Sequence, residues 1–175
     1  MCIKIFGRKP KPEKQEPLVV ENDLGPFTMG YLDKYNTRPV YAYSGSAVWN
    51  GSDIDVEVSC DDKETLAADK GFERLRALLA DAARIENRMK AFVLREHVDK
   101  DDGKVHIWGS CSDFTDGEQI ISCGEFVRRL SVFSICVLED GCVSFMLDLD
   151  EMYTDHCMEV FMEADGSFSS CSLVG

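Results

Sequence analysis

The sequence predicts an α+β fold in which a meandering antiparallel β-sheet packs against one main helical layer. Three turn dipeptides support the sheet: Asn50-Gly51, Asp140-Gly141 and Asp165-Gly166 each separate two apolar segments. Asn-Gly and Asp-Gly favour the tight turns that join antiparallel strands. The helical layer is supported by a change of hydrophobic period near residue 72, where alternation gives way to helical spacing.

The first strands are expected at 27–32, 40–49 and 54–60. Along the third segment apolar and polar residues alternate, the apolar ones being Ile54, Val56, Val58 and Cys60. This alternation indicates a strand with one buried face and one face in water.

A helical region is expected at about 63–98, because apolar residues recur at helical spacing across 72–93. Asp61 or Asp62 is a candidate cap for its start, and Gly71 is a candidate break between two helices. The apolar stripe of this region needs a partner, for which the buried face of the sheet is the natural choice.

After a short strand at 105–108 and a looser stretch, Ser122-x-x-Glu125 forms a capping box that opens a short helix ending at Arg129. The last third is predicted to be all strand, at 130–138, 143–147, 158–162 and 168–173. The first of these strands is apolar on both faces, which favours a central position covered on both sides.

The length of 175 residues suits one domain, predicted at 24–175. Residues 1–23 read as a flexible tail or linker, with an apolar tip followed by prolines and alternating charges. Residues 1–9 are a candidate for weak peripheral membrane or partner contact, and a mobile tail or an extra edge strand is the alternative. The apolar tip is too short for a secretory signal, and no apolar run approaches a membrane span, so we expect a cytoplasmic protein.

The net charge of −13 argues against nucleic acid as a ligand, because binding to phosphate requires Lys and Arg. The charge is uneven: residues 130–175 contain nine Asp and Glu and no Lys or Arg. A basic protein partner, a cation, or solubility alone would each account for this segment.

The eight cysteines show no C-x-x-C spacing, and several fall inside strand patterns. We interpret them as reduced, structural residues, with a zinc site or a functional disulfide as the alternative.

No catalytic or cofactor-binding residue is predicted. The histidines His97, His106 and His156 lie on different elements, and a Cys–His pair would require a tertiary contact. His156 and Cys157 are neighbours in the sequence and would point to opposite faces of a strand. The sequence also lacks G-x-S-x-G, P-loop, G-x-G-x-x-G and H-E-x-x-H motifs, so an enzyme is uncertain and disfavoured.

One acidic cluster offers metal ligands, the candidates being Asp148, Asp150, Asp155 and His156. The spacing imitates part of a calcium loop, but Met152 and Tyr153 occupy the positions of a ligand and of the turn glycine. An EF-hand is therefore rejected. A looser cation site and a solvated connector between strands remain as alternatives.

The main functional hypothesis is a non-catalytic protein–protein interaction domain that uses an acidic C-terminal surface, and an inhibitor of a basic toxin is one special case. The residues proposed for this surface are Glu139, Asp140, Glu151, Glu159 and Glu163. The alternative is a metal-dependent enzyme or cation-binding protein that uses the 148–156 cluster. The sequence identifies neither the partner nor the oligomeric state.

Residues 125–160 resemble the C-terminal half of an uncharacterised bacterial family, domain of unknown function 2262. The pattern is a helix ending in F-x-x-R-L, a strand, D-G, a second strand and D-x-D-M-F-x-G-H. The residues that match it are Phe126, Arg129, Leu130, Asp140, Gly141, Asp148, Asp150 and His156. Glu151 displaces Met152-Tyr153 by one residue, and Asp155 replaces the glycine. Trp49-Asn50-Gly51 fits an earlier W-x-G hairpin, so the resemblance extends over about 24–175. It implies a bacterial protein and supplies no activity and no functional residues.

Overall fold

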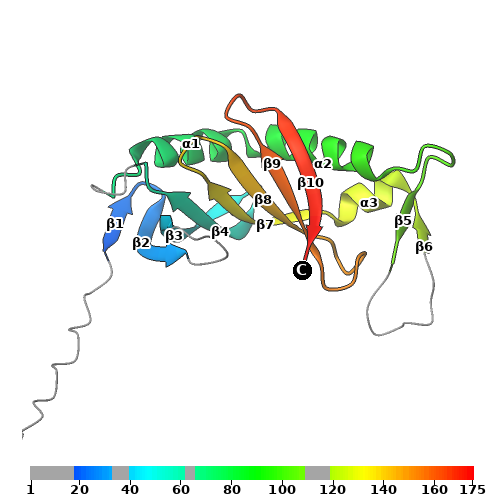
Figure 1. Cartoon of the computed structure of the whole chain (residues 1–175), viewed down its shortest axis with the longest axis horizontal. Helices are drawn as coiled ribbons and strands as arrows, with labels where there is room; N and C mark the ends of the chain where they lie inside the picture. Colours follow the sequence, from blue (N-terminus) through cyan, green and yellow to red (C-terminus); the bar gives the residue numbers. More distant parts are fainter. Residues whose placement is uncertain (1–17, 33–39, 62–65, 109–118) are drawn as a thin grey trace, which may run out of the picture.

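The computed structural model describes residues 18–32, 40–61, 66–108 and 119–175. Within these ranges one eight-stranded sheet is accompanied by three helices and a separate two-stranded pair (Figure 1). The strands of the large sheet are β1 (Val19–Asn22), β2 (Gly25–Leu32), β3 (Val40–Trp49), β4 (Ser52–Ser59), β7 (Ser131–Val137), β8 (Val143–Asp148), β9 (Cys157–Met162) and β10 (Phe168–Val174). They lie in the order β1-β2-β3-β4-β7-β8-β9-β10. The mixed α and β composition predicted from the sequence is confirmed.

The prediction of a wholly antiparallel sheet is wrong. β4 and β7 pair in parallel, from Asp55 opposite Ser134 to Val58 opposite Val137. The elements between these two strands are α1 (Asp69–Ala80), α2 (Ala82–His97), β5 (Val105–Ile107), β6 (Gln119–Ile121) and α3 (Cys123–Arg129). This long connection returns the chain to the end of the sheet at which β4 began, and parallel pairing requires such a crossover. The sheet therefore consists of two antiparallel meanders joined by one parallel pair.

The three predicted hairpin turns are confirmed. Asn50 and Gly51 both have positive φ, at 50° and 91°, as a type I′ turn requires. Gly141 and Gly166 have φ of 84° and 86° in the β7–β8 and β9–β10 turns. In each turn, glycine occupies a conformation that a side chain would strain.

The predicted helical region is divided at Asp81 and not at Gly71. Gly71 lies inside α1, where an added Cβ would sit 2.4 Å from Cγ1 of Val58. The missing side chain therefore allows α1 to approach β4 closely. Asp61 does not directly precede the helix, because α1 begins at Asp69. Its carboxylate nevertheless accepts a hydrogen bond from the backbone N–H of Lys70 in the first turn of α1, at 3.0 Å. The cap of α3 is as predicted, with Ser122 Oγ accepting from the N–H of Glu125 at 3.2 Å.

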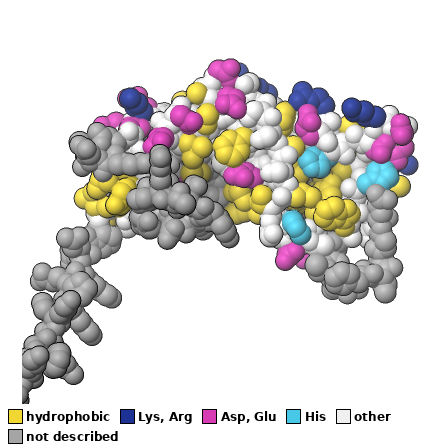
Figure 2. All heavy atoms as spheres, viewed as in Figure 1, with side chains coloured by type: hydrophobic (Ala, Val, Ile, Leu, Met, Phe, Trp, Pro, Cys, Tyr) yellow, Lys and Arg dark blue, Asp and Glu magenta, His cyan; other side chains and the backbone are white. Residues whose placement is uncertain are grey.

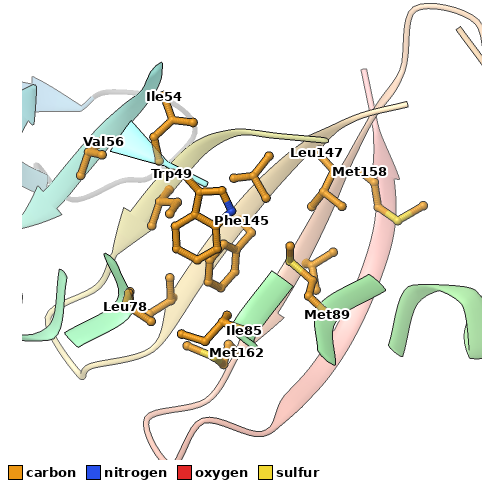
Figure 3. Close-up of a cluster of buried hydrophobic side chains, with 14 of the residues drawn as sticks. Trp49, Ile54, Val56, Leu78, Ile85, Met89, Phe145, Leu147, Met158 and Met162 are labelled. Atoms are coloured by element: carbon orange, nitrogen blue, oxygen red, sulfur yellow. The ribbon is translucent and has the colours of Figure 1, made fainter. Parts of the chain in front are cut away.

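The core lies between one face of the sheet and the helices α1 and α2, which run along that face (Figure 1). Figure 3 shows side chains from both sides meeting there. Trp49, Ile54 and Phe145 come from the strands, and Leu78 and Met89 come from the helices; all five are at most 3 % exposed. Burying an aliphatic or aromatic side chain of this size contributes about 1.5–3 kcal/mol, so the alternation along β4 and the stripe along the helices stabilise the fold jointly.

β7 has the predicted position in the middle of the sheet, but its second face is less covered than its first. Val132, Ile135 and Val137 are buried, whereas Phe133 is 41 % exposed and Cys136 is half-buried.

Of the predicted tail, residues 1–17 lie outside the described residues, including the segment considered for membrane contact. Val19–Asn22 forms β1 and pairs with β2, so the sheet begins before residue 24. β6, a three-residue strand that pairs with β5, was not predicted from the sequence. None of the described helices is both long and apolar enough to span a bilayer.

Candidate functional site

The loop between β8 and β9, residues 149–156, has the most strained backbone of the described chain. Asp150, Glu151 and Thr154 have φ of 47°, 59° and 61°. A side chain in this left-handed conformation costs roughly 1–2 kcal/mol per residue. Such strain persists only where the surroundings enforce it, and it concentrates at functional sites.

Buried side chains and one arginine enforce the shape of this loop. Leu149 and Met152 are fully buried, and the N–H of Met152 donates to the carbonyl of Leu149 at 3.0 Å. Arg129, at the end of α3, donates from Nε to the Asp150 carboxylate at 2.8 Å and from its terminal nitrogen to the Asp150 carbonyl. The loop is thereby fastened to both the core and α3.

Aromatic rings also pack around this loop. The Tyr153 hydroxyl donates to the carbonyl of His106 at 3.0 Å, and burial raises the pKa of this phenol. The ring of Trp108 stands edge-on to Tyr153 at 5.4 Å and to His156 at 6.3 Å between centroids. Trp108 is nevertheless 55 % exposed. Figure 2 shows histidine and hydrophobic side chains side by side at this end of the molecule.

Beside the loop lies a cleft of about 310 Å³. Its lining is Phe133, Asp148, Glu151, Thr154, Asp155, His156 and Cys157. The Thr154 hydroxyl lies 2.8 Å from Nδ1 of His156, and the Asp155 carboxylate lies 3.6 Å from the same nitrogen. The cleft therefore combines three carboxylates with one exposed phenyl ring.

The structure brings together only part of the predicted metal cluster. Asp148, Asp155 and His156 line the cleft, whereas the Asp150 carboxylate is bound by Arg129. Among the described residues no three His, Cys, Asp or Glu side chains are grouped closely enough to hold a metal ion. The metal site accordingly stays a prediction from the sequence.

A Cys–His pair exists through a tertiary contact, which the sequence was unable to show. Cys171 on β10 places its Sγ 4.0 Å from Nδ1 of His97 at the end of α2. The same nitrogen lies 3.0 Å from the carbonyl of Val93, which can only accept, so Nδ1 carries the proton and is not a base for the thiol. Burial also raises the pKa of Cys171, which disfavours the thiolate that a nucleophile needs.

The second feature of the site is the face of the sheet turned away from α1 and α2. It carries carboxylates from three strands, namely Asp53, Asp55, Glu57, Asp148 and Glu159, and we call it the acidic sheet face. The neighbouring residues on the same strands, such as Val56, Leu147 and Val160, are buried against the helices, and side chains alternate along a strand. Within the described ranges, every Lys and Arg belongs to α1, α2, α3 or the turn at 98–104. Lys and Arg side chains accordingly gather along the helix side in Figure 2.

Strand pairing connects the carboxylates of β4 with those of β8 and β9 on this face. Glu57 lies opposite Cys136, and Cys136 lies opposite Ser144. Ser144 Oγ donates to the Glu159 carboxylate at 2.7 Å. Burial, together with the negative charges of Glu57 and Glu159, raises the pKa of Cys136 to about 12. This thiol thus remains neutral in the middle of the face.

The residues predicted as a partner surface lie in three places. Glu139, Asp140 and Glu163 belong to the turns after β7 and β9. These two turns are linked by a hydrogen bond of 3.6 Å from the Cys142 thiol to the Glu163 carboxylate. Glu159 belongs to the acidic sheet face, and Glu151 lies in the loop at the other end of the strands. The β4 carboxylates are not part of the predicted surface, because they lie far from the acidic C-terminal segment in the sequence; their alternation with Ile54, Val56 and Val58 is the signal that places them on a wet face.

Residues 21–173 match the model of a family described as an uncharacterized protein conserved in bacteria (DUF2262). The chain belongs to this family. The resemblance seen in the sequence is thereby confirmed. In the structure, the W-x-G motif of the DUF2262 pattern (Trp49 to Gly51) forms the β3–β4 turn, and the D-x-D motif (Asp148 to Asp150) lies at the start of the strained loop. No curated protein and no solved structure matches this DUF2262 chain.

Proposed function

We propose that this DUF2262 protein is a protein-binding domain whose acidic sheet face docks a basic partner. The observation that carries the proposal is the separation of charge across the sheet. Carboxylates of β4, β8 and β9 share one face, and the described cations lie on the helices and the adjoining turn. Such separation orients an approaching basic protein and accelerates its encounter.

Among the described residues, the helices cover one face of the sheet and part of the opposite, acidic face is exposed. The proposal takes α1 and α2 as the main helical layer, which covers the apolar face through residues such as Leu75 and Met89. On the other face, Asp53 and Asp55 are exposed. Two small exposed side chains lie beside the carboxylates, Ser46 opposite Asp55 and Ser44 opposite Glu57, and the exposed Val48 lies opposite Asp53. The small side chains of Ser44 and Ser46 on β3 would allow a partner to approach the backbone closely beside the β4 carboxylates.

The cleft next to the strained loop extends the acidic sheet face, because Asp148 belongs to both. Its other acidic members are Glu151 and Asp155, and Phe133 contributes an exposed ring. Carboxylates stabilise an ammonium or guanidinium group, and an aromatic face adds about 0.5–2 kcal/mol. The cleft therefore suits one Lys or Arg side chain of the partner.

The test compares two double variants that remove the same charge from different places. Asp53→Asn with Asp55→Asn neutralises the acidic sheet face, and Glu73→Gln with Asp101→Asn neutralises exposed positions on α1 and in the 98–104 turn. The probe is a fluorescent 16-residue Lys-Gly repeat peptide, and its anisotropy is measured at low and at physiological salt.

We expect the first pair to weaken binding by about tenfold or more and the second pair by less than about threefold, since only close charges are coupled strongly. An equal loss of peptide affinity in both double variants would show that only the net charge of the protein matters, and it would contradict the proposal. Circular dichroism and urea unfolding confirm that each variant is folded.

A further inference from the structure

β10 is an edge strand of the sheet that the structure describes. Among the described strands it pairs with β9 on one side and with no strand on the other (Figure 1). Its seven residues, Phe168–Val174, include no Lys, Arg or Pro, and its one irregularity is a register shift between Phe168 and Ser170. Natural edge strands usually carry charges or prolines that prevent the pairing of another chain.

A groove runs beside this edge, between β10 and the C-terminal half of α2. Its volume is about 590 Å³. Its lining is Phe92, Arg95, Glu96 and His97 from the helix and residues 168–171 from the strand. The rings of Phe92 and Phe168 lie 5.7 Å apart, and the Arg95 guanidinium lies 5.1 Å from the Phe92 ring centroid. A strand edge facing a helix across such a groove is a recurrent site for an extended peptide, whose backbone pairs with the strand and whose alternate side chains enter the groove.

We propose that an extended segment of the basic partner binds here as a ninth strand, paired with β10. This inference rests on the proposed function. The charge of the chain, −13, disfavours a second copy of the same chain at the edge and favours a cationic segment.

Strand register defines the sequence pattern that this segment needs. Ser170 and Ser172 are exposed and lie opposite Phe161 and Glu159, so they belong to the acidic sheet face. Cys171 lies opposite the buried Val160 and lines the groove. Because side chains alternate along a strand, a bound segment places every second side chain near Glu159 and the others against Phe92 and Phe168. It therefore alternates cationic and apolar residues.

The test uses an eight-residue peptide of alternating Lys and Val, blocked at both ends, with the full-length protein. Binding is followed by backbone amide NMR shifts and by hydrogen exchange of the β10 amides. A second peptide with one central Val replaced by Pro keeps the charge but loses a backbone donor and the extended pairing.

We expect the first peptide to protect the amides of β10 and the proline peptide to bind at least about tenfold more weakly. In the protein, Ser170→Lys with Ser172→Lys places charges on the edge and should reduce binding by about tenfold or more. The matched control, Ala83→Lys with Ala91→Lys, adds the same charge at exposed positions of α2 and should change binding by less than about threefold.

Three outcomes would overturn the inference. The first is equal binding of both peptides. The second is binding that the edge variants leave unchanged while Asp53→Asn with Asp55→Asn abolishes it; the proposed function then stands without the edge. The third is a concentration-dependent dimer, seen by light scattering and lost in the edge variants, which would identify a second copy as the occupant. Protection of β10 that survives Asp53→Asn with Asp55→Asn would support the edge, because these two residues lie on β4, four strands away; the anisotropy measurement with the Lys-Gly peptide tests the proposed function separately.

Discussion

Trp49 at the end of β3 donates a hydrogen bond of 2.8 Å from its indole nitrogen to the carboxylate of Glu86 on α2. The same carboxylate accepts from the side chain of Asn50 and pairs with Lys90 at 2.8 Å. Trp49 is only 2 % exposed, so its indole ring is almost entirely shielded from water. One helical carboxylate thus joins the β3–β4 turn to the helix that covers it.

Replacement of Glu86 by Ala leaves the indole N–H buried without its acceptor, which costs about 1–3 kcal/mol. We therefore expect Glu86→Ala to lower the free energy of unfolding by this amount in urea titrations, and Glu86→Gln, which keeps an acceptor oxygen, to lower it less. Glu73→Ala, at an exposed position of α1, is the control and should stay within about 0.5 kcal/mol. Similar losses for Glu86→Ala and Glu73→Ala would contradict the role assigned to the contact.

The same carboxylate makes stability depend on pH. Burial alone would raise the pKa of Glu86, but hydrogen bonds from Lys90, Asn50 and Trp49 outweigh it and hold the pKa below its usual 4.5. A carboxyl with a lower pKa in the folded state stabilises the fold above its unfolded pKa, and this contribution is lost as the pH falls further. The stability difference between the wild type and Glu86→Gln should therefore be constant above about pH 5 and shrink below 4.5. Urea midpoints measured between pH 7 and pH 3 provide the check, and a difference that grows on acidification would have the wrong sign.

Gly71 is required by the close approach of α1 to β4. Because an added Cβ would sit 2.4 Å from Cγ1 of Val58, Gly71→Ala should destabilise the protein by about 1–3 kcal/mol. Gly124 in α3 is a matched control, since its added Cβ would meet nothing within 4 Å. There alanine should be neutral or stabilise by up to about 1 kcal/mol. The free energies of unfolding of both variants are measured in urea. Equal changes at the two positions would show that helix propensity and not packing governs position 71.

Arg129 should hold the strained loop in place, because it donates to both the carboxylate and the carbonyl of Asp150. In Arg129→Ala we expect the amides of Asp150 and Met152 to exchange with solvent roughly tenfold faster. Arg128→Ala removes a neighbouring, more exposed arginine that pairs with Glu125 within α3 and should leave this exchange unchanged. Hydrogen exchange followed by NMR separates the two, and equal protection in both variants would mean that the buried Leu149 and Met152 suffice.

The neutral thiol of Cys136 in the acidic sheet face should react slowly with alkylating reagents. With the pKa of Cys136 raised to about 12 from a usual 9, its thiolate fraction at pH 8 is lower by about 10³. Alkylation with iodoacetamide at pH 8, read by peptide mass spectrometry, should label Cys136 more slowly than the other half-buried cysteines, Cys123, Cys142, Cys157 and Cys171. Unfolding in urea is the internal control and should restore an ordinary rate. Rapid labelling of Cys136 in the folded protein would place it in a less buried, less acidic environment.

The sequence alone determined the elements whose causes are local. Asn50-Gly51 specifies its turn because two consecutive positive φ angles suit these residues, and Ser122 and Glu125 define the start of α3 through one side-chain hydrogen bond. The stripe from Leu75 to Val93 and the alternation along β4 predicted which faces are buried, because each follows the repeat of a single element.

Tertiary structure alone decided which elements meet. The parallel pairing of β4 with β7 joins residues about eighty positions apart, and no turn signal encodes it. This pairing places the β4 carboxylates on the same face as Glu159 and so creates the acidic sheet face. A second tertiary contact, between the end of α3 and the β8–β9 loop, pairs Asp150 with Arg129 and not with the other candidate ligands. Local sequence sets the direction of each side chain, but strand order is chosen by the burial of the whole sheet, which is a property of all its segments together.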